Sequence, residues 1–277
     1  MSLLIASLNS GSNGNCYYVG NEDTAVLVDA GLSCRETERR MNHLQLSLHK
    51  VKAIFISHEH TDHIKGLEGL SQKYGLPVYI SSKTLQNSRL RLNSALLAAF
   101  STSGTISIGG LQITSFSKKH DAAEPCSFVV QDHEVTVGVF TDIGVVCDQL
   151  IHYFRQCHAA FLESNYDDVM LETGRYPFHL KRRISGGRGH LSNLQAFTLF
   201  REHRAPHLSH VLLSHLSREN NCPKKAAELF RSDAGTVQVI VASRDEASAV
   251  YHIRPGALQQ AIPRPKTIVK PEQLALF

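Results

Sequence analysis

The first residues of the sequence have little of the charge and apolar length that a targeting segment needs. Its first 14 residues, MSLLIASLNSGSNG, contain no lysine or arginine and no long apolar run. Neither a signal peptide nor a membrane-spanning helix is therefore expected at this end of the chain. The sequence predicts a cytoplasmic protein without a membrane partner.

Closely spaced cysteines are missing as well. No two of the six cysteines form a Cys-x-x-Cys motif, and their wide spacing argues against both a zinc knuckle and a disulfide framework. Reduced thiols, mostly packed inside the protein, are expected. The cysteines are Cys16, Cys34, Cys126, Cys147, Cys157 and Cys222.

Metal-capable side chains are instead concentrated in His58-Glu59-His60-Thr61-Asp62-His63, directly after the apolar run 51–57. Alternate residues of a strand lie on one face, so His58 and His60 can point the same way and share one ion. If a helix opens near Asp62, Asp62 and His63 can face a second ion roughly 3.5–4 Å from the first. Such ligands suit zinc. The alternative interpretation is a solvated polar loop.

The His-x-His-x-Asp-His motif after an apolar strand resembles the signature of the metallo-β-lactamase fold. Members of this family are α/β proteins, αββα four-layer sandwiches that bind one or two metal ions at one sheet edge. The resemblance implies a catalytic domain over residues 1–253 with no large inserted domain. A flexible proline-rich tail is expected over residues 254–277.

The resemblance also implies the remaining ligands of a two-metal site. His120 would complete the protein ligands of the first ion, Asp142 would bridge both ions, and His215 would bind the second. Asp29, which ends an apolar strand, would accept a hydrogen bond from a ligand histidine and orient it. Two divalent transition-metal ions, Zn, Mn or Fe, are thus expected on His58, His60, Asp62, His63, His120, Asp142 and His215.

The number of residues between the motifs indicates which branch of this fold family the chain resembles. Only 21 residues separate His120 from Asp142, too few for the substrate-gripping arm of transfer-RNA-maturing relatives. The 72 residues between Asp142 and His215 leave no room for the extra domain of larger RNA- and DNA-cleaving relatives. Four motifs together resemble the bacterial YycJ/WalJ (VicX-like) subgroup; they are the segments 10–15, 120–125, 189–193 and 215–221.

Members of that subgroup are thought to degrade double-stranded DNA from the 5′ end. The resemblance implies a metal-dependent phosphodiesterase, a 5′-to-3′ exonuclease of replication or repair, including mismatch repair, with double-stranded DNA as its partner. Two metals can ionise a bridging water and stabilise charge on the phosphate being cleaved. The predicted catalytic residues are Asp62, Glu163 and His190, with His190 as the general acid because the Glu163/His190 positions match such a pair in RNA-processing relatives.

Polar and cationic residues near these motifs are predicted to contact phosphates. The glycine-rich segment 10–15 can offer N–H groups to an anion, with an ordinary hairpin turn as the alternative. The basic stretch 175–188 is either a solvated helix face or a phosphate-binding surface. The candidate contacts are Ser12, Asn15, Lys181, Arg182, Ser217, Asn220 and Asn221.

Two other functions stay open at this point. A small-molecule phosphodiesterase, for example one acting on cyclic ribose phosphates, would use the same residues in a closed pocket. A non-catalytic signalling or scaffold protein is disfavoured by the complete ligand set. The formal net charge of +4, which bound cations would raise, favours a polyanionic substrate.

The last five residues resemble the short motif by which bacterial replication and repair enzymes dock into the DNA sliding clamp. Gln273, Leu274, Leu276 and Phe277 are the expected anchors. They follow a proline-rich segment that favours an extended linker. The alternative is that these side chains pack back onto the domain.

Periodicity and turn residues predict the surrounding elements. A helix is expected over 33–46 with Ser33 as its cap and Arg35, Arg39 and Arg40 on its exposed side. Two more helices are expected over 64–74 and 82–100, followed by a hairpin with its turn at Gly109-Gly110. Strands that alternate with helices in this way indicate an α/β sheet.

Overall fold

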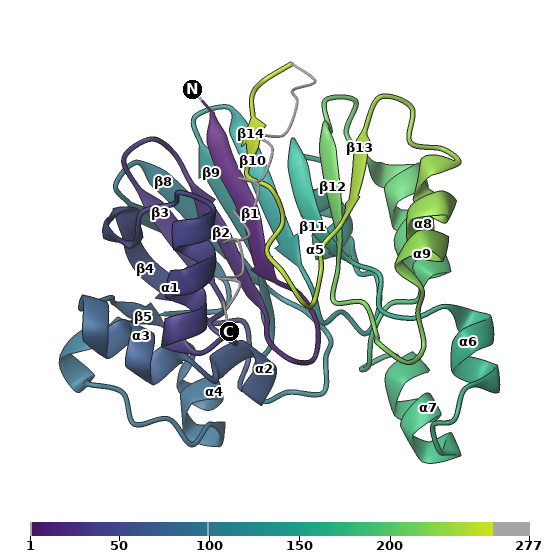
Figure 1. Ribbon diagram of the computed structural model, residues 1–277, viewed down its shortest axis with the longest axis horizontal. Coiled ribbons are helices and arrows are strands. Elements are labelled where there is room, and N and C mark those ends of the chain that lie inside the picture. The colour runs from purple at the N-terminus through teal and green to yellow at the C-terminus, as the bar shows by residue number, and fades with distance from the viewer. Residues whose placement is uncertain (1, 99, 257–277) are drawn as a thin grey trace, which may run out of the picture.

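The apolar segments of the sequence form two seven-stranded sheets that pack face to face, with helices on both outer faces (Figure 1). The computed structural model describes residues 2–98 and 100–256. The αββα arrangement expected from the resemblance is therefore confirmed, and no large inserted domain interrupts the described residues. The C-terminal anchors predicted to bind a clamp lie outside them.

The first sheet has the strand order β14-β1-β2-β3-β4-β5-β6 and the second the order β13-β12-β11-β10-β9-β8-β7. The first contains β1 (Leu3–Asn9), β2 (Cys16–Gly20), β3 (Ala25–Val28), β4 (Val51–Phe55), β5 (Val78–Tyr79), β6 (Leu97–Ala98) and β14 (Tyr251–Ile253). The second contains β7 (Gly104–Ile108), β8 (Leu111–Ser117), β9 (Cys126–Asp132), β10 (Val135–Phe140), β11 (Ala159–Glu163), β12 (His210–Ser214) and β13 (Gln238–Val241).

Helices cover the outer face of each sheet (Figure 1). Those that follow strands of the first sheet are α1 (Cys34–His43), α2 (Thr61–Ile64), α3 (Leu67–Tyr74) and α4 (Ser82–Asn87), with short 3-10 turns at Leu48–Lys50 and Ser94–Leu96. Those associated with the second are α5 (Asp148–Phe154), α6 (Asp168–Thr173), α7 (Phe178–Ser185), α8 (Asn193–His203) and α9 (Pro223–Arg231). No helix in the described part of the chain is long and apolar enough to span a bilayer.

Three apolar layers hold the sandwich together. The central layer lies between the sheets and includes Tyr17, Phe55, Phe128 and Phe161. Each outer layer packs the remaining face of one sheet against its helices. Because both faces of the central strands are buried, these strands are almost continuously apolar.

Strand direction brings the polar motifs to one edge. Strands β3 and β4 are parallel, as are β10, β11 and β12. Strand β8 is antiparallel to β9, which is antiparallel to β10, so β8 also runs with this group. The residues that follow these strands therefore meet at the same edge of the sandwich.

Three expectations about the elements are wrong in whole or in part. Within the described residues of 82–100, only α4 is α-helical and Ser94–Leu96 forms a 3-10 turn. Leu90 and Leu92 alternate with arginines in a period of two, and 97–98 pairs with β5 as an edge strand. The helix expected over 64–74 is present as α3 and ends at Tyr74 as predicted, but it begins only at Leu67, because Ile64 belongs to α2 and Gly66 separates the two helices. Arg40 is buried rather than exposed, with 7% of its surface accessible.

Candidate metal centre

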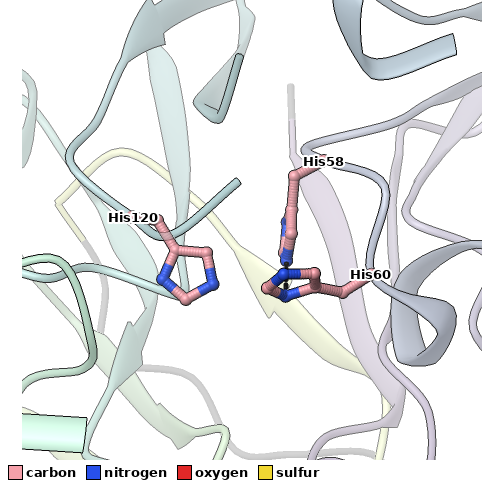
Figure 2. A group of neighbouring side chains, drawn as sticks. All are labelled: His58, His60 and His120. Carbon is pink, nitrogen blue, oxygen red and sulfur yellow. Dashed lines mark hydrogen bonds between the residues drawn. The ribbon is translucent and has the colours of Figure 1, made fainter. Parts of the chain in front are cut away.

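Three histidines from both sheets surround one small space (Figure 2). His58 and His60 follow β4, and His120 follows β8 on the other sheet. His58 Nε2 lies 3.0 Å from His60 Nδ1, and the ligand-capable atoms of the three residues lie within 4.8 Å of one another. His58 and His120 are buried, whereas His60 is partly exposed. The strand-end placement predicted from the sequence thus brings these rings together.

Asp62, His63 and His215 form a second group. Asp62 and His63 lie in α2, which opens directly after His60, and His215 follows β12. His63 Nε2 is 3.5 Å and His215 Nε2 is 3.4 Å from the Oδ2 atom of Asp62. One ligand atom from each residue lies within 4.8 Å of the others.

Asp142, which follows β10, lies between the two groups. Its Oδ2 atom is 3.3 Å from His63 Nε2, and its Oδ1 atom is 3.8 Å from His120 Nε2. The carboxylate therefore faces one histidine from each group. This is the position that a carboxylate shared by two cations requires.

Unpaired buried atoms show that the groups fit a cation. His120 Nε2 and Asp142 Oδ2 are both shielded from solvent and make no hydrogen bond, although Asp142 Oδ2 lies 3.3 Å from His63 Nε2. A buried polar atom without a partner costs about 1–3 kcal/mol, so such atoms call for a ligand. Clustered imidazole and carboxylate groups are the ligands that divalent transition metals accept. We conclude that this edge of the sandwich is built to bind divalent metal.

The second nitrogen of the histidines is held by the surrounding protein. His63 Nδ1 lies 2.7 Å from Asp29 Oδ2, and His120 Nδ1 donates to the Gly189 carbonyl at 2.9 Å. The Ser57 hydroxyl lies 2.9 Å from both Asp29 Oδ2 and His58 Nδ1. Such contacts fix the orientation of each ring. Asp29 therefore lies where the resemblance placed it, against a histidine of the site.

The backbone is strained at three positions of this edge. Asp29, Asp142 and His215 have φ angles of 61°, 54° and 57°. Non-glycine residues rarely adopt this left-handed conformation, which costs of order 1–3 kcal/mol and is concentrated at functional sites. In each case the turn directs the side chain at the end of a strand into the site.

Glu163 and His190 form a pair beside these clusters. Glu163 ends β11 and is fully buried, and its Oε1 atom lies 2.8 Å from His190 Nδ1. The amides of Ile143 and Leu191 donate to its Oε2 atom at 2.7 and 3.2 Å. Burial opposes ionisation of Glu163, but His190 outweighs it and lowers the pKa of this carboxyl to about 2. Glu163 is therefore a fixed anion that positions His190.

Burial controls the charge of two histidines. It lowers the pKa of His58 well below the ordinary value and that of His120 to about 4. Both rings are therefore neutral near pH 7. Neutral imidazole is the form that binds a metal ion.

Neighbouring carboxylates control the charge of His63 and His215. Burial acts to lower the pKa of His63, but Asp142 and Asp29 raise it well above its ordinary value. Burial likewise opposes protonation of His215, yet Asp142 and Asp62 raise its pKa to about 10. These two rings hold protons in the absence of a cation, so metal binding must release them.

Several predicted phosphate contacts have other partners. Asn15, fully buried, donates to Asp62 Oδ2 at 3.1 Å and thus contacts a residue of the site. Asn221 donates to the carbonyls of Ser164 and Asn165 at 2.8 and 3.0 Å. Asn220 has no accessible surface. Burial of these three side chains contradicts direct contact with a phosphate; Ser12, which is exposed, and Ser217, which is partly exposed, remain candidates.

Three residues that support the site were not predicted from the sequence. Ser57 joins Asp29 to His58, and Asn165 donates to the His215 carbonyl at 2.7 Å. The Ser10 hydroxyl accepts from the His215 amide at 2.7 Å. Each lies within two residues of a strand end or motif, and this position was the feature of the sequence that could have identified it. Their roles nevertheless depend on partners that are distant in sequence.

Comparison with known proteins agrees with this geometry. Residues 24–216 match the family model described as Beta-lactamase superfamily domain. The chain is 37% identical over 229 residues to the exodeoxyribonuclease YycJ of Bacillus anthracis, covering 82% of this chain and 87% of that protein. It is 32% identical over 224 residues to the exodeoxyribonuclease WalJ of Streptococcus pneumoniae, covering 79% and 83%.

The fold is also found in solved structures. The metallo-beta-lactamase fold protein YhfI of Bacillus subtilis superimposes with a TM-score of 0.70 at 18% identity, covering 91% of this chain and 100% of that chain. At this identity the likeness concerns the fold alone. The family match and the two sequence relatives show that the chain belongs to the beta-lactamase superfamily, in its YycJ/WalJ subgroup.

Proposed function

We propose that this protein is a metal-dependent phosphodiesterase, a 5′-to-3′ double-stranded DNA exonuclease that acts in cytoplasmic DNA replication or repair, including mismatch repair. The observation that carries the proposal is the Glu163–His190 pair at 2.8 Å beside the metal-binding groups. The names of the relatives YycJ and WalJ, both exodeoxyribonucleases, support the same substrate class.

A dinuclear site is proposed because two of the four overlapping groups of ligand-capable residues share no member, and Asp142 lies between them. His58, His60 and His120 would hold one ion, and Asp62, His63 and His215 the other. Bound divalent ions would lower the pKa of a water and stabilise negative charge on the phosphate. Asp62, which lies 3.4 Å from His215 Nε2, would also help to orient the attacking water.

The leaving alkoxide needs a proton, which we assign to His190. Its Nδ1 atom is occupied by Glu163, so Nε2 is the nitrogen that can donate to the departing oxygen. The buried Glu163 carboxylate holds the ring so that Nε2 faces away from the pair's own contact. With 20% of its side chain exposed, His190 is also the accessible member of the pair.

A duplex substrate is favoured over a small diester by the charge on α7. This helix contains Lys181, Arg182 and Arg183 and no acidic residue, and none of its residues is buried. A cationic, exposed helix beside a phosphodiesterase site suits the backbone of DNA. Lys181 and Arg182 therefore remain the proposed phosphate contacts, together with Ser12 and Ser217.

The experiment that tests the proposal uses the purified, metal-loaded protein on duplexes labelled at either the 5′ or the 3′ end. The 5′-labelled duplex should lose its label early. The 3′-labelled strand should shorten progressively from its 5′ end. Release from the 3′ end would contradict the polarity. Hydrolysis of cyclic ribose phosphates without cleavage of duplex would replace the proposal with the small-molecule activity.

The C-terminal anchors give a further part of the proposal, based on sequence alone. We propose that Gln273, Leu274, Leu276 and Phe277 bind the DNA sliding clamp, because a tether to a ring around DNA raises the local concentration of enzyme near duplex. Deleting residues 273–277 is expected to abolish clamp binding while cleavage of short free duplex stays unchanged. Equal clamp binding by the intact and truncated proteins would disprove this part.

A further inference from the structure

The large exposed apolar side chains lie on three consecutive helices. Within residues 2–98 and 100–256, the large hydrophobic residues that are exposed are Val169, Phe178 and Leu194. All three lie on consecutive helices, α6, α7 and the start of α8. Phe178 is the most exposed, with 74% of its surface accessible, and it is the aromatic member of the three.

Polar bonds, rather than core packing, hold α7 in place. Lys181 Nζ donates to the Glu172 carbonyl at 2.5 Å, and Arg183 Nε donates to Asp121 Oδ2 at 2.5 Å. No residue of this eight-residue helix is buried. Because short helices depend on packing for their stability, a helix with no buried face and fixed ends is suited to contact something outside the domain.

The end of α7 is attached to the metal centre. The His190 amide donates to the Ile184 carbonyl at 2.8 Å, and Gly189 accepts from His120 Nδ1 at 2.9 Å. Figure 1 shows α7 projecting beyond the ends of β11 and β12. Phe178 stands six residues before Ile184, about 9 Å along the helix axis.

The chemistry around Phe178 is suited to a nucleobase. The Arg182 guanidinium lies 5.8 Å from the centre of the Phe178 ring, and the helix carries positive charge without acidic residues. Aromatic side chains on a cationic surface bind single-stranded nucleic acid by stacking on the bases while the cations contact the backbone. Arginine at such a ring adds a cation–π contribution.

We propose that Phe178, backed by Arg182, is a stacking site for an unpaired base of the DNA strand. This inference rests on the proposed function. Because α7 is joined to the metal centre through Gly189 and His190, that base would belong to the strand whose phosphodiester reaches the site. Stacking there would hold open the end of a duplex while the neighbouring phosphodiester enters the metal centre.

The test measures binding to two DNA ligands under conditions without cleavage. Both are duplexes with a three-nucleotide single-stranded overhang, but one overhang carries bases and the other is abasic with the same charge. Phe178→Ala is expected to weaken binding of the base-bearing overhang roughly 5- to 150-fold. On the abasic overhang it is expected to bind within about twofold of the unaltered protein.

Three further variants separate stacking from other causes. Phe178→Trp should restore binding, whereas Phe178→Leu, which keeps an apolar side chain, should not. Val169→Ala, a change at an exposed apolar residue on the neighbouring helix, is the matched control and should bind both ligands normally. Thermal melting and metal content of each variant establish that the fold is intact.

Three results would overturn the inference. Phe178→Ala could bind both ligands normally, or its affinity could fall by the same factor for both ligands. Alternatively, Phe178→Leu could bind the base-bearing overhang as tightly as the unaltered protein. In each of these cases the unaltered protein still binds DNA, so the proposed function stands. If the unaltered protein binds neither ligand and cleaves no duplex, the proposed function fails and the stacking site fails with it.

Discussion

At the scale of single residues, the site depends on what lies behind each ligand-capable histidine. Asp29 and Ser57 hold His63 and His58, and the Gly189 carbonyl holds His120. Each contact uses one ring nitrogen and leaves the other directed into the site. This arrangement assigns the tautomer as well as the orientation of the rings.

His190 differs from these residues because its ring is partly exposed. We expect His190→Ala to slow DNA cleavage by about 10²–10⁴-fold, since the leaving group then lacks its proton donor. Metal content should be unchanged, because His190 is assigned as a donor and not as a ligand. Cleavage rates and elemental analysis measure the two effects.

The control for this variant is His152→Ala, which removes an exposed histidine from α5. It should cleave at the normal rate. Loss of metal from His190→Ala would instead make His190 a ligand, since it lies close to Asp142, Glu163 and His215.

At the scale of elements, close approach between loops positions the second group of ligands. A Cβ atom on Gly31 would lie 1.7 Å from the Asp62 carbonyl oxygen and 2.5 Å from the Asn15 amide nitrogen. The turn after β3 therefore presses directly against the start of α2. Only glycine permits this contact, and through it the position of Asp62 depends on a residue of another loop.

We expect Gly31→Ala to weaken both stability and metal binding. The added methyl group must displace the Asp62 backbone, and overpacking of this kind costs about 1–3 kcal/mol. A displaced Asp62 carboxylate also weakens the second metal group. Urea unfolding and zinc titration measure the two effects.

Gly104→Ala provides the comparison, because no atom lies within 4 Å of the position of its added Cβ. It should be close to the unaltered protein in both measurements. If Gly31→Ala bound zinc with normal affinity, the link between this turn and Asp62 would be wrong.

At the scale of the whole molecule, the metal centre joins the two sheets. His58, His60, Asp62 and His63 follow β4 of the first sheet, whereas His120, Asp142 and His215 follow strands of the second. An ion bound by both sets must therefore stabilise the packing of one sheet on the other. Ligands that bind only the folded state raise its stability by mass action.

We expect removal of metal by a chelator to lower the melting temperature by about 10 °C. Free metal at about 1,000 times its Kd stabilises the folded state by about 4 kcal/mol, and each kcal/mol shifts Tm by about 2–4 °C at this size. Differential scanning calorimetry measures the change. Chelator already saturated with zinc is the control and should leave Tm unaltered. Equal melting of the metal-loaded and metal-free proteins would show that the ions do not bridge the sheets.

Local patterns in the sequence are enough to predict some parts of this structure. The apolar run before His58, the alternation of His58 and His60, and the Ser33 cap are encoded within a few residues of each other, and they give the strand end, the paired rings and the start of α1. Similarity of the ligand motifs to a known family then supplied His120, Asp142 and His215. The same similarity predicted the fold and the grouping of these residues.

Which polar side chains remain open to a substrate depends on long-range packing. Arg40 seemed a surface residue by its helix position, but it is buried and donates to the Leu8 carbonyl at 2.7 Å. Asn15, Asn220 and Asn221 were predicted phosphate contacts, yet all three are enclosed. The partners that bury them lie tens or hundreds of residues away in the chain, and no local pattern encodes such contacts. Long-range packing supplies partners for the buried side chains of Arg40, Asn15 and Asn221. The side-chain nitrogen and oxygen of Asn220 are enclosed by the same packing without a hydrogen-bond partner.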